Sequence, residues 1–141
     1  MAVNFPNSPA VNDTFSSGNI TYTWDGTAWR ALGVGEVGFR DVPQNAQTAS
    51  YTLVLGDRGK HISITTGGVT VPANSATAFP VGSTISIYNN SASSQTIAIT
   101  TDTMYLAGTS TTGTRTLDQR GLATLLKVAS TVWVIAGAGV T

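Results

Sequence analysis

The chain has 141 residues, no cysteine, and seven basic residues balanced by seven acidic ones, so that only 10% of its residues are charged. A typical domain has about 25%. This composition excludes a disulfide framework and a thiolate metal site, and it offers no basic footprint for a nucleic acid. Threonine (23 residues) and serine (13 residues) take the place of charge, and a net charge near zero favours association. We therefore expect a subunit of an assembly.

The chain begins with a polar segment that is expected to be an extended arm. Residues 1–19 are rich in Asn, Pro and Ser, and they lack the cationic and apolar regions of a signal peptide. No stretch of the sequence approaches 18 apolar residues, so we expect no membrane insertion. Exposed polar termini are ordered only when something holds them. The arm should therefore pack on its own domain or on a partner.

Residues 20–32, with the sequence ITYTWDGTAWRAL, predict a β-hairpin. Asp25-Gly26 between alternating residues is a strong turn signal, because glycine adopts positive φ without steric cost. The turn should bring Tyr22, Trp24 and Trp29 together. A hairpin of two strands is marginal in water, so these rings need an apolar partner surface. One WD dipeptide without a repeat excludes a propeller.

Two interpretations of this hairpin stay open. In the favoured one, the aromatic side chains form a clamp that docks on the body of the protein or on a neighbouring subunit. In the other, they form a platform on which a sugar stacks. The candidate anchor and interface residues are Phe5 in the arm, Tyr22, Trp24 and Trp29 in the hairpin, and Trp133 near the C-terminus.

The remainder of the chain predicts short β-strands separated by turns. Residues 33–49 are expected to be a linker, followed by strands at 50–55, 60–66, 83–89 and 95–100. Their inward residues should be Tyr51, Leu53, Leu55, Ile62, Ile64, Ile85, Ile87, Ile97 and Ile99. Pro72 and Pro80 remove the segment between them from any central strand. Residues 108–114 should be a flexible loop.

Two further runs, 122–128 and 131–136, are apolar on both faces, which predicts strands that lie centrally or at a subunit contact. Trp133 lies in the second of them. The whole pattern predicts an all-β chain with an arm and small hairpin over residues 1–45. Residues 46–141 should form an antiparallel β-sandwich or a jelly-roll-like barrel.

No pattern of catalytic residues is present, and we expect neither enzyme activity nor a cofactor or metal site. The single histidine, His61, should lie on the strand face opposite Ile62 and Ile64, at the surface or at an interface. The carboxylates form no calcium loop or other motif; they are Asp13, Asp25, Glu36, Asp41, Asp57, Asp102 and Asp118. Most of them stand where turns favour aspartate.

Three segments of the C-terminal part resemble a β-rich module of tailed-bacteriophage virion proteins, found in tail fibres and related surface proteins. The segments are YTLVLGDRGKHISI, VTVPANSATAFPVGSTISIYNNSASSQTIAI and LATLLKVASTVWVIAG. The matching residues are Tyr51 to Leu55, Asp57, Gly59, Lys60, Val71 to Ser75, Phe79 to Gly82, Ala123 to Leu125, Lys127, Trp133, Val134 and Gly137. The first part, with FPNSP and ITYTWDGTAWRAL, is similar to an N-terminal segment of phage fibre proteins.

This resemblance implies a non-enzymatic structural protein of the virion, usually a homotrimer, made in the host cytoplasm. An arm of about 45 residues meets a compact module without a shaft between them, which favours a capsid decoration or cement protein on the capsid surface. Its partner would then be the major capsid protein or another virion protein. The alternative is a short tail-fibre or appendage protein that binds a host-surface glycan through the hairpin aromatics or the 108–114 loop.

Overall fold

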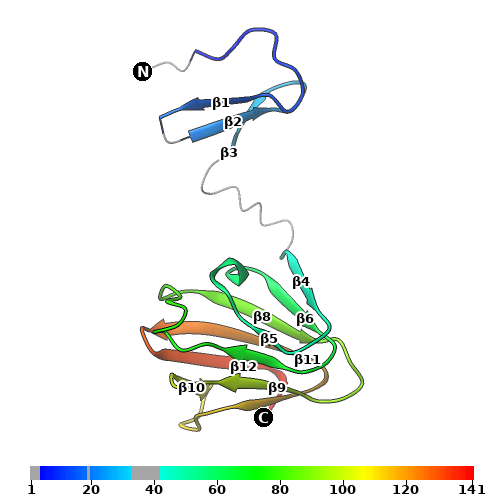
Figure 1. The fold of residues 1–141 in the computed structure, drawn as a ribbon, viewed down its shortest axis with the longest axis vertical. Coiled ribbons are helices and arrows are strands. Elements are labelled where there is room, and N and C mark those ends of the chain that lie inside the picture. The colour runs from blue at the N-terminus through cyan, green and yellow to red at the C-terminus, as the bar shows by residue number, and fades with distance from the viewer. Residues whose placement is uncertain (1–3, 19, 33–41) are drawn as a thin grey trace. The chain divides into compact units, whose positions relative to one another are not determined.

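The structure, a computed structural model, describes residues 4–18, 20–32 and 42–141 (Figure 1). The chain forms two compact units, residues 1–41 and residues 42–141, here called the N-terminal unit and the C-terminal module. The sequence division lay between residues 45 and 46. The structure divides the chain earlier because β4 (Gln44–Gln47) pairs with β6 (His61–Ile64) of the module. Residues 44–47 of the predicted linker (33–49) are therefore a strand. Residues 33–41 of it lie outside the described part.

The N-terminal unit contains a three-stranded antiparallel sheet in the order β1-β2-β3, formed by β1 (Thr14–Ser17), β2 (Ile20–Trp24) and β3 (Trp29–Leu32). The predicted hairpin is confirmed, with Trp24 paired to Trp29. Its loop has four residues, 25–28, and Asp25 closes it by accepting bonds from the backbone amides of Thr27 (2.8 Å) and Ala28 (2.7 Å). The third strand, β1, was expected to be extended arm.

The C-terminal module is a single sheet that curls into a nearly closed barrel. Its further strands are β5 (Tyr51–Thr52), β7 (Val69–Val71), β8 (Thr84–Asn89), β9 (Gln95–Ile99), β10 (Thr103–Leu106), β11 (Arg115–Ala129) and β12 (Val132–Val140). The order is β4-β6-β8-β11-β9-β7-β5, and β12 pairs with both β11 and β10. A 3-10 turn, η1 (Leu55–Asp57), follows β5. The all-β prediction is confirmed, and residues 42–141 contain no α-helix.

The predicted antiparallel arrangement is wrong for most of the module. From β4 to β9, successive strands alternate between two arms of the sheet (Figure 1). Each of β6, β7, β8 and β9 therefore lies beside the strand two places earlier and is parallel to it. One arm is β4-β6-β8 and the other is β5-β7-β9. The long β11 is antiparallel to both β8 and β9, and it thereby joins the two arms.

The turn between β6 and β7 depends on glycine. Gly67 and Gly68 have φ values of +83° and +72°, and a Cβ on Gly68 would lie 2.5 Å from the carbonyl oxygen of Thr96. A residue with a side chain would be strained there by its backbone angle and by the contact. The tight turn lets consecutive strands pass from one arm to the other.

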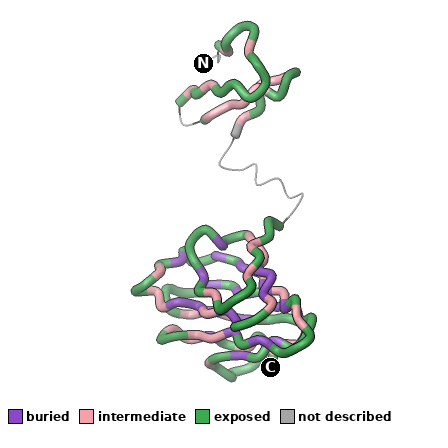
Figure 2. Tube along the Cα trace, turned by 45° about the vertical axis from the view of Figure 1, so that its right-hand side comes forward, coloured by how far each residue is buried: buried purple, intermediate pink, exposed green. Residues whose placement is uncertain are grey.

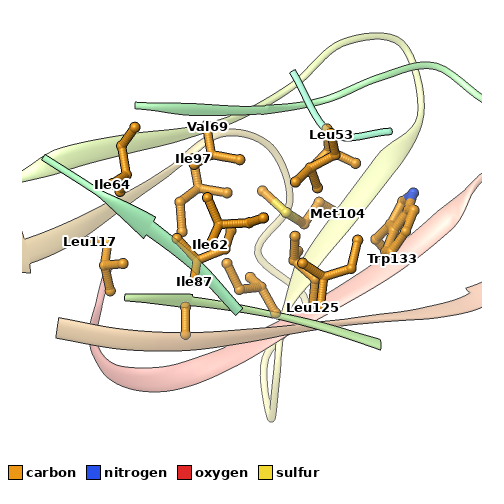
Figure 3. Close-up of a cluster of buried hydrophobic side chains, with 14 of the residues drawn as sticks. Leu53, Ile62, Ile64, Val69, Ile87, Ile97, Met104, Leu117, Leu125 and Trp133 are labelled. Atoms are coloured by element: carbon orange, nitrogen blue, oxygen red, sulfur yellow. The ribbon is translucent and has the colours of Figure 1, made fainter. Parts of the chain in front are cut away.

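Side chains from both arms fill the interior of the barrel (Figure 3), and Figure 2 shows the buried residues spread over the strands of the module. The core contains Leu53, Ile62, Ile64, Val69, Val71, Phe79, Ile85, Ile87, Ile97, Met104, Leu117, Ala123, Leu125, Trp133 and Ile135. The predicted inward isoleucines are confirmed, although Ile99 is only half-buried. Leu55 was expected inside but is 44% exposed, because β5 ends at Thr52 and the chain turns into η1.

Candidate interaction sites

The predicted aromatic residues of the N-terminal unit do come together, and Phe5 from the arm lies among them. The register places Tyr22, Trp24 and Trp29 on one face of the sheet, together with Phe15, which pairs with Tyr22. The ring of Phe5 stacks on Trp29 with centroids 5.6 Å apart and meets the edge of Tyr22 at 4.9 Å. The arm thus supplies part of the apolar cover that the hairpin needs.

All five rings remain half-buried within the described residues. Trp29 contacts three of the others, Phe5, Phe15 and Trp24, whereas Trp24 has a ring contact with Trp29. Aromatic side chains of this size bury about 150–250 Å² each when fully covered. The aromatic cluster, defined as Phe5, Phe15, Tyr22, Trp24 and Trp29, therefore keeps apolar area available for a contact. Its role as an anchor stays a prediction.

One ion pair stands beside this cluster on the same hairpin. The Nε of Arg30 donates to Oδ2 of Asp25 at 2.7 Å. The Arg30 guanidinium, followed by the amides of Ala28 and Thr27, lowers the pKa of the Asp25 carboxyl below its usual range. Both side chains are substantially exposed, so the pair fixes the local shape of the turn and adds little stability.

Trp133 lies in the core and not at the surface, where an interface residue is expected. Its side chain is fully buried in the core of the C-terminal module, where Phe79 meets its ring edge-on at 5.4 Å. A side chain without exposed surface cannot contact a partner from outside. The assignment of Trp133 to an interface is therefore corrected, and its role is to pack the core.

A network of polar side chains in the C-terminal module is centred on Asp57. Asp57, which is 1% exposed, accepts hydrogen bonds from Asn45 Nδ2 (2.8 Å), Tyr51 Oη (3.0 Å) and the backbone amide of Val54 (2.9 Å). Burial, and then the bond to Asp57, raises the pKa of the Tyr51 hydroxyl above its ordinary value. This network closes the turn after β5 and holds the Tyr51 hydroxyl against Asp57.

A second pair of polar side chains lies near Trp133. The Nζ of Lys127 on β11 donates to Oδ1 of Asn74 at 2.7 Å and stands 5.3 Å from the centre of the Trp133 ring. Sequence patterns do not reveal this pair, because the two residues are 53 positions apart.

His61 is half-buried at the outside of β6, on the face opposite Ile62 and Ile64, as the sequence predicted. Its Nδ1 lies 3.1 Å from the carbonyl oxygen of Val42, and its Nε2 lies 3.0 Å from Nε2 of Gln44. A carbonyl requires a donor, so Nδ1 carries the proton and Nε2 accepts from the Gln44 amide. Both ring nitrogens are therefore used in holding β4 against β6.

On the outer side of β6, β8, β11, β12 and β10, one continuous area contains no charged side chain, and the exposed Asp118 and Arg120 of β11 precede it in the strand. The registers bring the following residues onto it, here called the outer face: His61, Ser63, Thr84, Ser86, Tyr88, Tyr105, Leu122, Thr124, Leu126, Val134, Ala136 and Ala138. Leu122 is 52% exposed, Leu126 41% and Tyr105 38%. The prediction that 122–128 is apolar on both faces is correct, and one of those faces is open.

Two kinds of feature are absent from the part of the chain that the structure describes. No group of three or more His, Cys, Asp or Glu side chains comes together as metal ligands would. No described helix is long and apolar enough to cross a membrane.

Comparison of the sequence with protein-family models and with curated proteins gives no match.

Proposed function

We propose that this chain is a non-enzymatic structural protein of a bacteriophage virion, a homotrimeric capsid decoration or cement protein that attaches through its N-terminal unit. The sequence resemblance supports the virion assignment. The division into two units, each with an apolar surface of its own, supports a protein that makes two different contacts. The major capsid protein, or another virion protein, is the partner of the N-terminal unit.

The observation that carries the proposal is the outer face of the C-terminal module. Leu122 and Leu126 stand there beside Val134 and Tyr105, and no Asp, Glu, Lys or Arg lies among them. Strand spacing and rise give the part over β8, β11, β12 and β10 a projected area of about 400 Å². An area of this size is within the range of the largest surface patches of monomers, which are often functional, and is about half of a standard interface per partner.

A second copy of the chain is the partner that suits this face best. An uncharged face can be covered by another copy without burying an unpaired charge or placing like charges together. A strongly charged ligand would find no countercharge on it. The homotrimer therefore associates through this face, while the N-terminal unit stays available for the capsid.

Sedimentation velocity on the full chain tests the association. We expect a trimer at micromolar concentration, and Leu126→Glu should shift the protein toward monomer because it would bury a charge in the contact. Val54→Glu is the matched control, since Val54 is apolar, 50% exposed and follows β5, a strand that does not contribute to the outer face. A stable wild-type monomer, or equal effects of the two variants, would refute the proposed interface.

The attachment is tested on the particle. Purified virions should contain the chain at a fixed number of copies per capsomer, with its density on the head. Density on the tail would instead favour the second candidate, a fibre or appendage that binds a host glycan. The half-buried Trp24 and Trp29 support that alternative, and glycan-array binding that is lost in Trp24→Ala would establish it.

A further inference from the structure

A buried lysine lies against an asparagine beside the core of the C-terminal module. Lys127 is 1% exposed, and its Nζ donates to the side-chain oxygen of Asn74 at 2.7 Å. Lys127 pairs with Trp133 across β11 and β12, and Nζ lies 5.3 Å from the indole ring. The backbone amide of Asn74 donates to Oδ2 of Asp102 at 3.1 Å. Asp102 thus fixes the loop that carries Asn74.

This environment is unfavourable for an ammonium group. An ammonium has three N–H donors, and Asn74 is the one hydrogen-bond acceptor that the described residues give it. The indole face compensates for part of the lost hydration. Burial lowers the pKa of the Lys127 amine below its ordinary value, although the charge of Asp102 opposes this. The neutral amine, which is the nucleophilic form, is therefore easier to reach here than at an exposed lysine.

We propose that Lys127 and Asn74 form an intramolecular isopeptide bond, so that the C-terminal module contains a covalent cross-link between β11 and the loop after β7. The bonded oxygen of Asn74 is about 1.2 Å from its carbonyl carbon. A small rotation of the amide brings that carbon to the roughly 3–3.5 Å at which a nucleophile attacks. The inference stands apart from the proposed virion function.

The reaction is balanced without an added reagent. The free amine of Lys127 attacks Cγ of Asn74, the Nζ–Cγ bond forms, and the Cγ–Nδ2 bond breaks. The protons released by Nζ pass through the carboxylate of Asp102 to the departing nitrogen, so one ammonium group is consumed and one ammonium ion leaves. The product is a secondary amide, which is uncharged. Its formation removes the cost of keeping a charge in this buried place.

Intact-mass spectrometry of the purified full chain under denaturing conditions tests the proposal. We expect a mass lower than the sequence mass by one ammonia molecule, and a branched peptide that joins Asn74 to Lys127 after digestion. Lys127→Arg should keep the full mass. Lys60→Arg is the matched control, because Lys60 is the other lysine of the chain, and it should still lose ammonia. Asp102→Asn should slow the loss.

Two results would overturn the inference. One is a wild-type chain at its full sequence mass. The other is a loss of ammonia that persists in Lys127→Arg, because a succinimide at Asn74-Ser75 loses the same mass without the lysine. Since the wild-type mass is the primary measurement, a variant that fails to fold does not obscure the outcome.

Discussion

Asp57 is a carboxylate with almost no exposed surface, and its partners are uncharged donors. Asn45, Tyr51 and the amide of Val54 all donate to it. Removing the acceptor would leave three donors unsatisfied in a buried place, so Asp57→Ala should lower the free energy of unfolding by about 3 kcal/mol. Urea denaturation measures this. Asp118→Ala, at an exposed position, should change it by less than about 0.5 kcal/mol, and equal effects would show that the network contributes no stability.

Tyr51 gives this network a dependence on alkaline pH. Its hydroxyl pKa is raised above 10.0 in the folded protein, so above pH 10 the unfolded chain releases the proton while the folded chain retains it. Stability therefore falls as the pH rises through this range. The difference in unfolding free energy between wild type and Tyr51→Phe should shrink or reverse between neutral pH and pH 11. A difference that does not vary with pH would contradict the assigned shift.

At the scale of elements, the sequence located most strands of the module but not their directions. Alternating residues such as Ile62 and Ile64 identify a strand with a buried face, and this signal is local. Strand direction depends on which distant strand lies alongside, and nothing within a short run encodes that. The short β1, β4, β7 and β10 were missed because polar residues dominate them or because they follow a neighbouring strand closely.

The candidate sites were predictable to a similar extent. The hairpin signal at Asp25-Gly26 brought Tyr22, Trp24 and Trp29 together correctly, because a tight turn fixes which side chains face each other. The packing of Phe5 over them could not be derived, since it depends on the path of the arm. Trp133 was misplaced because a buried and an interfacial tryptophan have the same sequence pattern.

Within the aromatic cluster of the N-terminal unit, replacing Trp29 should cost more stability than replacing Trp24. Trp29 contacts three rings and Trp24 contacts one, so Trp29→Ala should destabilise this unit by about 2–3 kcal/mol and Trp24→Ala by about 1 kcal/mol, below the range for fully buried tryptophans. Hydrogen exchange of the backbone amides measures the local stability. In Trp29→Ala, the backbone amide of Trp24, which donates to the carbonyl oxygen of Asp13 in the wild type, can be followed. The other amides of β2 and β3 are followed in both variants, so that the two losses of stability can be compared. The reverse order would show that Trp24 has a partner beyond this cluster.

At the scale of the whole molecule, the proposal assigns attachment to the N-terminal unit and self-association to the C-terminal module. Every residue of the hydrophobic core belongs to residues 42–141, and the outer face lies on the same module. A fragment of residues 42–141 should therefore fold alone, with the fluorescence of its single tryptophan, Trp133, typical of a buried indole. It should unfold at the same urea concentration as the module within the full chain.

The same fragment separates self-association from attachment. Because the outer face is intact, residues 42–141 should sediment as the same oligomer as the full chain. They should fail to bind particles that lack this protein, because Phe5, Trp24 and Trp29 are gone. Co-sedimentation with such particles gives the measurement, with the full chain as the positive control. Particle binding by the fragment would assign the anchor to the module, and a monomeric fragment would assign the oligomer contacts to the N-terminal unit.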